Sequence, residues 1–162
     1  MRRRDGTADG FRARRPQRRY HPCVGRTAFG RNRMSTHPHF DDKGAVRWHS
    51  DYATAAAEAK AAGKRLFIES GRQACGNCRI LVEQIIPRAE VAAALNRDFV
   101  CYADDCDDMA PEVRTLGGTH MPFARSLPFV LLADADGKWL GGGSGATTAE
   151  ALLKLLGDAV KG

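Results

Sequence analysis

Hydrophobic residues in this chain form short continuous runs that alternate with longer stripes at helical spacing, beginning near residue 48. The apolar runs at 65–70, 99–103 and 127–134 predict buried strands. The third run has a proline at its very start, where a strand tolerates one. The turn sequence DADG and the following KWLGG then predict a fourth strand, which forms a hairpin with the third.

The helical stripes lie between these runs. Strong helix formers predict a helix over 51–63, which begins after a capping residue and ends at a glycine. A second helix is expected from Cys75, with an interruption at Pro87. A short helix is expected at 111–116, and an amphipathic helix with a threonine cap at 147–160.

This order of elements predicts an α/β fold. Strands that are separated by helices should run parallel, whereas the hairpin is antiparallel. We therefore expect a three-layer α/β/α domain around a central mixed sheet of about four to five strands. The chain has 162 residues, of which 43% are hydrophobic and 27% charged, a composition typical of globular proteins. Its apolar runs are too short to predict a membrane span.

Charge divides the chain into two parts. Residues 1–33 hold eleven arginines against two aspartates, a net charge of +9, whereas the remainder carries −3. Residues 1–44 also lack hydrophobic periodicity, which predicts a disordered Arg-rich extension before a folded domain at 45–162. Met34 is a plausible alternative start. No nucleic-acid motif or secretory h-region is recognised, so we expect no nucleic-acid partner and a cytoplasmic location.

The cysteines supply the candidate chemistry. The chain has five, an odd and sparse set that does not describe a disulfide-stapled secreted scaffold. Cys75 and Cys78 lie together in the sequence QACGNCR. This pair is open to three interpretations: a disulfide that opens and closes, half of a metal site, or two ordinary thiols.

The surroundings of the pair favour redox chemistry. Cys75 lies where a strand and loop lead into a helix, and a helix N-terminus stabilises a thiolate. Arg72 and Arg79 are expected to add positive potential. Cys78 follows one helical turn later and can reach the first sulfur. Cys75 can then attack a substrate disulfide, and Cys78 can resolve the mixed disulfide.

Two further features support this hypothesis. Glu69 ends an otherwise apolar strand six residues before the first cysteine, and it could take the proton from Cys78. Leu127 and Pro128 open a later strand. A cis bond there would place backbone groups where a substrate strand can pair, although a trans turn proline is the alternative. We expect substrate to contact Leu127, Pro128 and the dipeptide Gly76-Asn77.

From Trp48 to Val160 the chain resembles the thioredoxin-like superfamily, above all the branch that includes the C-terminal domain of bacterial thiol:disulfide interchange proteins. The segments AEAKAAGKRLFIES, CGNCR, NRDFVCYADD, LPFVLLADADGK and GGGSG carry the resemblance. It implies that Cys75 attacks, Cys78 resolves, Glu69 is the buried acid and Pro128 the cis-proline. It also implies no cofactor, an upstream dithiol reductant, and disulfides of proteins or small molecules as substrates.

The chain departs from thioredoxin at three places. Ala74 replaces the tryptophan before the first cysteine, Gly76-Asn77 replaces the Gly-Pro dipeptide, and Leu127 replaces a small or β-branched residue. These differences concern general thioredoxin activity and its usual reductase partner, and they leave the dithiol chemistry intact. The sequence thus predicts a thiol–disulfide oxidoreductase that uses its Cys-Gly-Asn-Cys dithiol to reduce or exchange disulfides.

Two other functions compete with this prediction. Cys75, Cys78, Cys101 and Cys106 together could bind structural zinc, with His120 as a further ligand. Against zinc, Cys101 lies inside a predicted buried strand, so no metal is predicted. The second alternative is a thioredoxin-like binding module without redox turnover.

Overall fold

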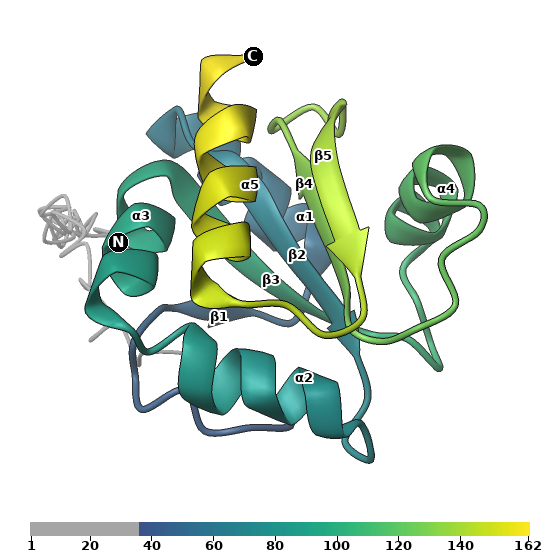
Figure 1. The fold of residues 1–162 in the computed structure, drawn as a ribbon. Helices are drawn as coiled ribbons and strands as arrows, with labels where there is room; N and C mark the ends of the chain where they lie inside the picture. The colour runs from purple at the N-terminus through teal and green to yellow at the C-terminus, as the bar shows by residue number, and fades with distance from the viewer. Residues whose placement is uncertain (1–35) are drawn as a thin grey trace, which may run out of the picture. The chain divides into compact units, whose positions relative to one another are not determined.

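A computed structural model describes residues 36–162 (Figure 1), which form a five-stranded sheet in the order β1-β3-β2-β4-β5. The strands are β1 (Trp48–His49), β2 (Arg65–Gly71), β3 (Phe99–Asp105), β4 (Phe129–Ala133) and β5 (Trp139–Ser144). β1, β3 and β2 are parallel, whereas β4 is antiparallel to both β2 and β5. The predicted mixed sheet is confirmed, and β1 is an addition to the predicted strands.

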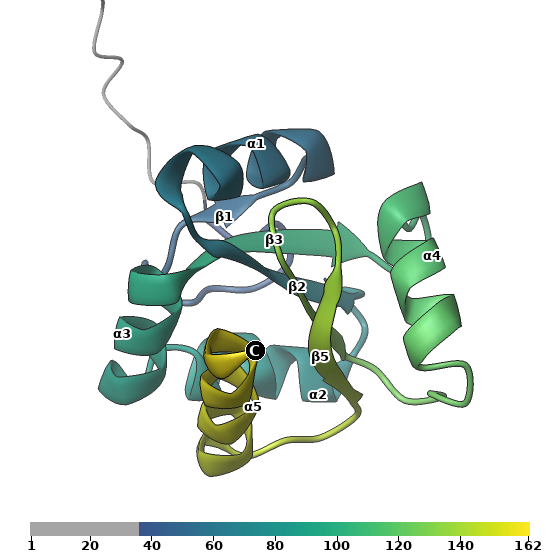
Figure 2. The same ribbon diagram turned by 90° about the horizontal axis from the view of Figure 1, so that it is seen from above.

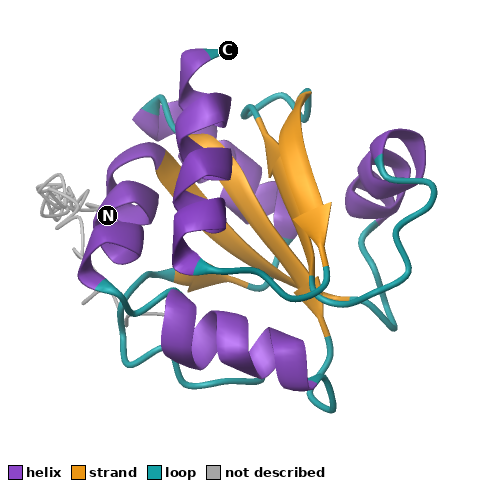
Figure 3. Ribbon diagram, viewed as in Figure 1, coloured by secondary structure: helices purple, strands orange, loops and turns teal. Residues whose placement is uncertain are grey.

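Helices cover both faces of this sheet, as Figures 2 and 3 show. They are α1 (Tyr52–Ala62), α2 (Gly76–Ile80), the π-helical stretch η1 (Leu81–Ile85), α3 (Ala89–Asp98), α4 (Pro111–His120) and α5 (Ala149–Lys161). α2, η1, α3 and α5 contribute to one hydrophobic cluster, and α1 and α4 contribute to a second on the other face. The predicted α/β/α layers are therefore confirmed.

Local signals set the ends of the helices as the sequence predicts. The Asp51 side chain caps α1 by accepting a hydrogen bond from the Thr54 amide at 2.7 Å. Gly63 ends the helix with a φ of 63°, a left-handed conformation that glycine adopts without steric cost. Thr148 caps α5 in the same way as Asp51 caps α1.

Strand pairing places the two predicted substrate-binding stretches next to each other. β2 ends at Gly71, just before the loop that leads to the cysteines. Because β4 is antiparallel to β2, its first residue lies beside the end of β2, with Phe129 opposite Ser70. Pro128, which precedes β4, is consequently at the same edge of the sheet as the CxxC pair.

The predicted domain boundary between residues 44 and 45 needs correction. Phe40 is buried in the core cluster that contains α2, and Asp42 is fully buried. The Asp42 carboxylate accepts hydrogen bonds from the amides of Gly44 and Val46 and from the indole N–H of Trp48. Residues 36–44 are thus part of the domain, because they supply apolar surface and hydrogen bonds that the following residues use.

The remainder of the predicted extension, residues 1–35, lies outside the described residues, as does the proposed start at Met34. Within the part of the chain that the structure describes, no helix combines the length and apolar character needed to cross a membrane.

Candidate active site

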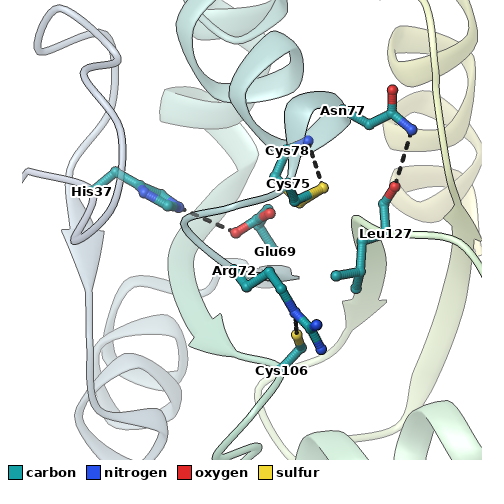
Figure 4. The surroundings of a disulfide bond; sticks show 8 residues. All are labelled: His37, Glu69, Arg72, Cys75, Asn77, Cys78, Cys106 and Leu127. Carbon is teal, nitrogen blue, oxygen red and sulfur yellow. Dashed lines mark hydrogen bonds and ion pairs between the residues drawn. A yellow bond between two sulfur atoms is a disulfide. The ribbon is translucent and has the colours of Figure 1, made fainter.

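Cys75 and Cys78 form a disulfide at the start of α2 (Figure 4). Cys75 is the N-cap residue, and its sulfur accepts a hydrogen bond from the Cys78 amide at 3.1 Å. Cys75 is half-buried, whereas Cys78 has 0% exposure and belongs to the core. A substrate can therefore reach the sulfur of Cys75, whereas the sulfur of Cys78 is enclosed by the protein.

Glu69 lies under this disulfide as the fifth residue of β2, and it is only 1% exposed. Its Oε2 atom lies 3.1 Å from Nε2 of His37. Its Oε1 atom is buried and has no hydrogen-bond partner among the described residues. A Cβ atom placed on Gly71 would meet both this oxygen and, at 2.9 Å, the Cys78 sulfur. The free oxygen and the resolving sulfur consequently line the same small space.

His37 is a site residue that sequence reasoning missed. It comes from the segment that was predicted to be disordered, yet it is buried at 4% exposure. Figure 4 shows it pointing toward Glu69 from the side opposite to the cysteines. The surrounding THPHF sequence has no helical or strand period that could have indicated burial.

Leu127 and Pro128 flank the disulfide on the β4 side, and the peptide bond between them is cis. Pro128 is buried. The Asn77 side chain reaches across from α2 and donates a hydrogen bond to the Leu127 carbonyl oxygen at 3.4 Å. Gly76 is exposed between the two cysteines. The structure therefore brings Leu127 and Pro128 next to the Gly76-Asn77 dipeptide of the half-buried Cys75.

The two arginines expected near the cysteines have other partners. Arg72 donates from Nε to the Cys106 sulfur at 3.2 Å and forms an ion pair with Asp107 at 2.8 Å. The hydrogen bond to Cys106 raises the pKa of the Arg72 guanidinium above its usual range, and the charge of Asp107 acts in the same direction. Arg79 lies over the ring of Phe40, 5.8 Å from its centroid. Neither arginine has a hydrogen bond to the disulfide sulfurs in the described structure.

The ligands of the alternative zinc site are dispersed. Cys101 is buried in β3 within the core, and burial raises the pKa of its thiol. His120 stacks on Trp139, with ring centroids 4.8 Å apart. In the described residues, Cys106 gathers only with Asp105 and Asp107 among possible ligands. The geometry does not bring the four cysteines together.

The sheet order, the CxxC pair at the start of α2 and the proline that precedes β4 define the thioredoxin-like class of folds. The chain belongs to the thioredoxin-like family, because the model of that family matches residues 47–135, more than half of the chain. No curated protein matches the chain.

Solved structures share this fold at low identity. A putative disulphide isomerase from Bacteroides thetaiotaomicron is 26% identical with a TM-score of 0.57, covering 71% of this chain and 91% of that one. A thioredoxin from Thermus thermophilus is 21% identical with a TM-score of 0.56, covering 72% and 88%. A disulphide isomerase from Xylella fastidiosa is 19% identical with a TM-score of 0.54, covering 69% and 93%.

Proposed function

We propose that this protein is a thiol–disulfide oxidoreductase that reduces or exchanges disulfides of proteins or small molecules. The observation that carries the proposal is the asymmetry of the pair: a half-exposed Cys75 is disulfide-bonded to a fully buried Cys78. A substrate can meet only the first sulfur, so attack and resolution fall to different cysteines. The likeness to a protein described as a putative disulphide isomerase, from Bacteroides thetaiotaomicron, supports the same chemistry.

The first step uses the reduced dithiol. The Cys75 thiolate, stabilised by the Cys78 amide that points at its sulfur, attacks one sulfur of the substrate disulfide. A bond forms between Cys75 and that sulfur, the substrate S–S bond breaks, and the other substrate sulfur leaves as a thiolate.

The second step releases the substrate. Cys78 gives its proton to the free Oε1 of Glu69 and attacks the Cys75 sulfur. The Cys75–Cys78 bond forms, and the second substrate sulfur leaves as a thiolate. The substrate gains two electrons, and the protein is restored by an upstream dithiol that reduces its disulfide. Every step is carried by side chains, with no cofactor required.

Substrate docking uses the backbone beside the disulfide. The Leu127 carbonyl accepts a hydrogen bond from Asn77 of the CxxC segment, and Gly76 is exposed between the cysteines. An extended substrate segment can donate an N–H group to the Leu127 carbonyl in place of Asn77.

The proposal is tested by dithiothreitol-driven reduction of insulin. We expect Cys75→Ser to abolish turnover and Cys78→Ser to accumulate a mixed disulfide that mass spectrometry detects. Cys106→Ser is the matched control and should retain turnover. A wild-type protein without activity, and unchanged by Cys75→Ser, would instead support a thioredoxin-like binding module.

The proposal also includes the direction of electron transfer, from the protein to its substrate, and a cytoplasmic location. A potential near that of thioredoxin, roughly −270 mV, is expected for a reductant in a reducing compartment, whereas an oxidant would lie near about −120 mV. Equilibration with glutathione, followed by trapping of free thiols, gives this value.

A further inference from the structure

His37 is held in place on three sides. Its ring stacks on Phe40 with centroids 5.6 Å apart, and it forms a T-shaped contact with Trp48 at a centroid distance of 4.7 Å. Its third neighbour is the carboxylate of Glu69, although the two residues are 32 positions apart in sequence. A side chain so confined has little rotamer freedom, so its ring nitrogens have fixed directions.

The second ring nitrogen defines the tautomer. The backbone N–H of His39 donates to Nδ1 of His37 at 3.2 Å. A backbone amide can only donate, so Nδ1 must present a lone pair and the ring proton must be on Nε2. His37 is consequently neutral, and its Nε2–H donates to Oε2 of Glu69 at 3.1 Å.

This hydrogen bond makes the two oxygens of Glu69 unequal. Oε2 has a donor, whereas Oε1 has no hydrogen-bond partner in the described part of the chain and faces the space shared with the Cys78 sulfur. A buried carboxylate is costly unless it is hydrogen-bonded, and His37 supplies that bond without bringing a positive charge. The oxygen that remains available lines the same space at Gly71 as the Cys78 sulfur.

We propose that His37 is a positioning residue for Glu69. It orients the carboxylate by binding Oε2, so that Oε1 accepts the Cys78 proton when Cys78 attacks the mixed disulfide. This inference rests on the proposed function, since it assigns a role within the resolving step. The bonds and electrons of that step are unchanged: His37 keeps its Nε2 proton throughout, and the proton that moves is that of Cys78.

Within residues 36–162, the groups around this pair come from the N-terminal segment, α2 and the neighbouring strands. From the N-terminal side come His39, through its amide, and Asp42, whose carboxylate is bound to Trp48. From α2 come the cysteines and Arg79, which lies over Phe40. The β3 residue beside Glu69 is Ala103, which brings no charge.

The test separates the two steps of exchange with DTNB. The full chain carries the substitutions Cys23→Ser and Cys106→Ser. Its remaining cysteines are then the dithiol pair and the buried Cys101. The reduced protein in excess releases one TNB thiolate when Cys75 attacks, and a second when Cys78 resolves. The rate of the second phase is measured across pH for wild type, His37→Leu and His37→Gln.

We expect His37→Leu to slow the second phase roughly tenfold or more at pH 7, because a buried carboxylate that loses its donor favours the protonated form. The pH midpoint of this phase should rise by about one unit or more, and the first phase should stay within about twofold. His37→Gln keeps an N–H near the position of Nε2 and should restore the rate to within about threefold. If the role of His37 were purely structural, His37→Gln would not restore the rate of the second phase.

Two results have distinct meanings. A wild-type second phase and pH profile in His37→Leu would overturn the role of His37 while leaving the proposed function standing. Absence of a second phase in wild type, or its persistence in Cys78→Ser, would overturn the proposed function itself. If His37→Leu does not fold, His37→Asn replaces it, because the shorter amide of asparagine does not reach Glu69. His37→Asn must then show the shift in the pH midpoint of the second phase that His37→Gln lacks.

Discussion

The Asn77 side-chain amide donates a hydrogen bond to the Leu127 carbonyl oxygen at 3.4 Å, on the surface where substrate is proposed to dock. Asn77 therefore occupies the acceptor that an extended substrate would use. We predict that Asn77→Ala raises kcat/KM for a peptide disulfide about twofold to fivefold, because substrate no longer has to displace the amide.

The measurement compares a peptide disulfide with cystamine, which has no peptide backbone. The gain should be confined to the peptide. Gln73→Ala changes an exposed side chain on the same loop and is the matched control. Equal gains on both substrates would contradict competition for the Leu127 carbonyl.

The Asp42 carboxylate gives a second prediction, on stability. Asp42→Ala leaves the amides of Gly44 and Val46 and the indole of Trp48 without their acceptor. We expect a loss of about 2–4 kcal/mol in the free energy of unfolding. Urea titration followed by tryptophan fluorescence measures it. Asp41→Ala, at an exposed neighbour, should change stability by less than about 1 kcal/mol. Equal effects would mean that residues 36–44 do not unfold with the domain.

Gly71 gives a third prediction, because its missing side chain makes room for Glu69 and Cys78. A methyl group there would meet the Glu69 carboxylate and come within 2.9 Å of the Cys78 sulfur. Gly71→Ala should therefore destabilise the oxidised protein by about 1–3 kcal/mol.

Guanidinium unfolding of the oxidised protein checks this value. The control is Gly118→Ala in the last turn of α4, where nothing lies within 4 Å of an added Cβ. That substitution should stabilise by about 0.5–1 kcal/mol, since alanine favours a helix over glycine. The same change of residue thus has opposite signs at the two sites, and a neutral Gly71→Ala would refute the close packing.

The cysteines outside the disulfide give a fourth prediction. Burial raises the pKa of the Cys101 thiol, so little reactive thiolate forms at pH 8. Cys106 is only half-buried, so a reagent in solution can reach its sulfur, which accepts a hydrogen bond from Arg72. We expect iodoacetamide to label Cys106 at least about 100-fold faster than Cys101 in the native protein. Peptide mapping by mass spectrometry gives both rates, and comparable labelling would contradict the burial of Cys101.

Much of the site could be predicted because its signals are local. The strand that ends at Gly71, the helix that begins after Cys75 and the proline before β4 each depend on a few neighbouring residues. Once the first strands are parallel and the last two form a hairpin, the sheet topology brings Glu69 and Pro128 to the same edge.

The N-terminal part of the site could not be predicted in this way. The burial of His37 and Phe40 depends on tertiary contacts, among them that of His37 with Glu69, 32 positions away, and their own segment is polar and aperiodic. β1 has only two residues, too few for an alternation of polar and apolar positions, and its pairing with β3 is a tertiary contact. Sequence periodicity reports local conformation, so it detects neither the burial of His37 and Phe40 nor the pairing of β1.

The segment at 36–44 also determines how this domain can be moved between proteins. The span that defines the family starts at residue 47, after His37, Phe40 and Asp42. A gene fragment cut to that span would still encode the dithiol and the buried acid, but it would remove the donor to Glu69 and the cover of Trp48. The smallest portable unit of this protein therefore begins upstream of the segment by which its family is recognised, and fusions or transplanted domains should keep residues 36–46 attached.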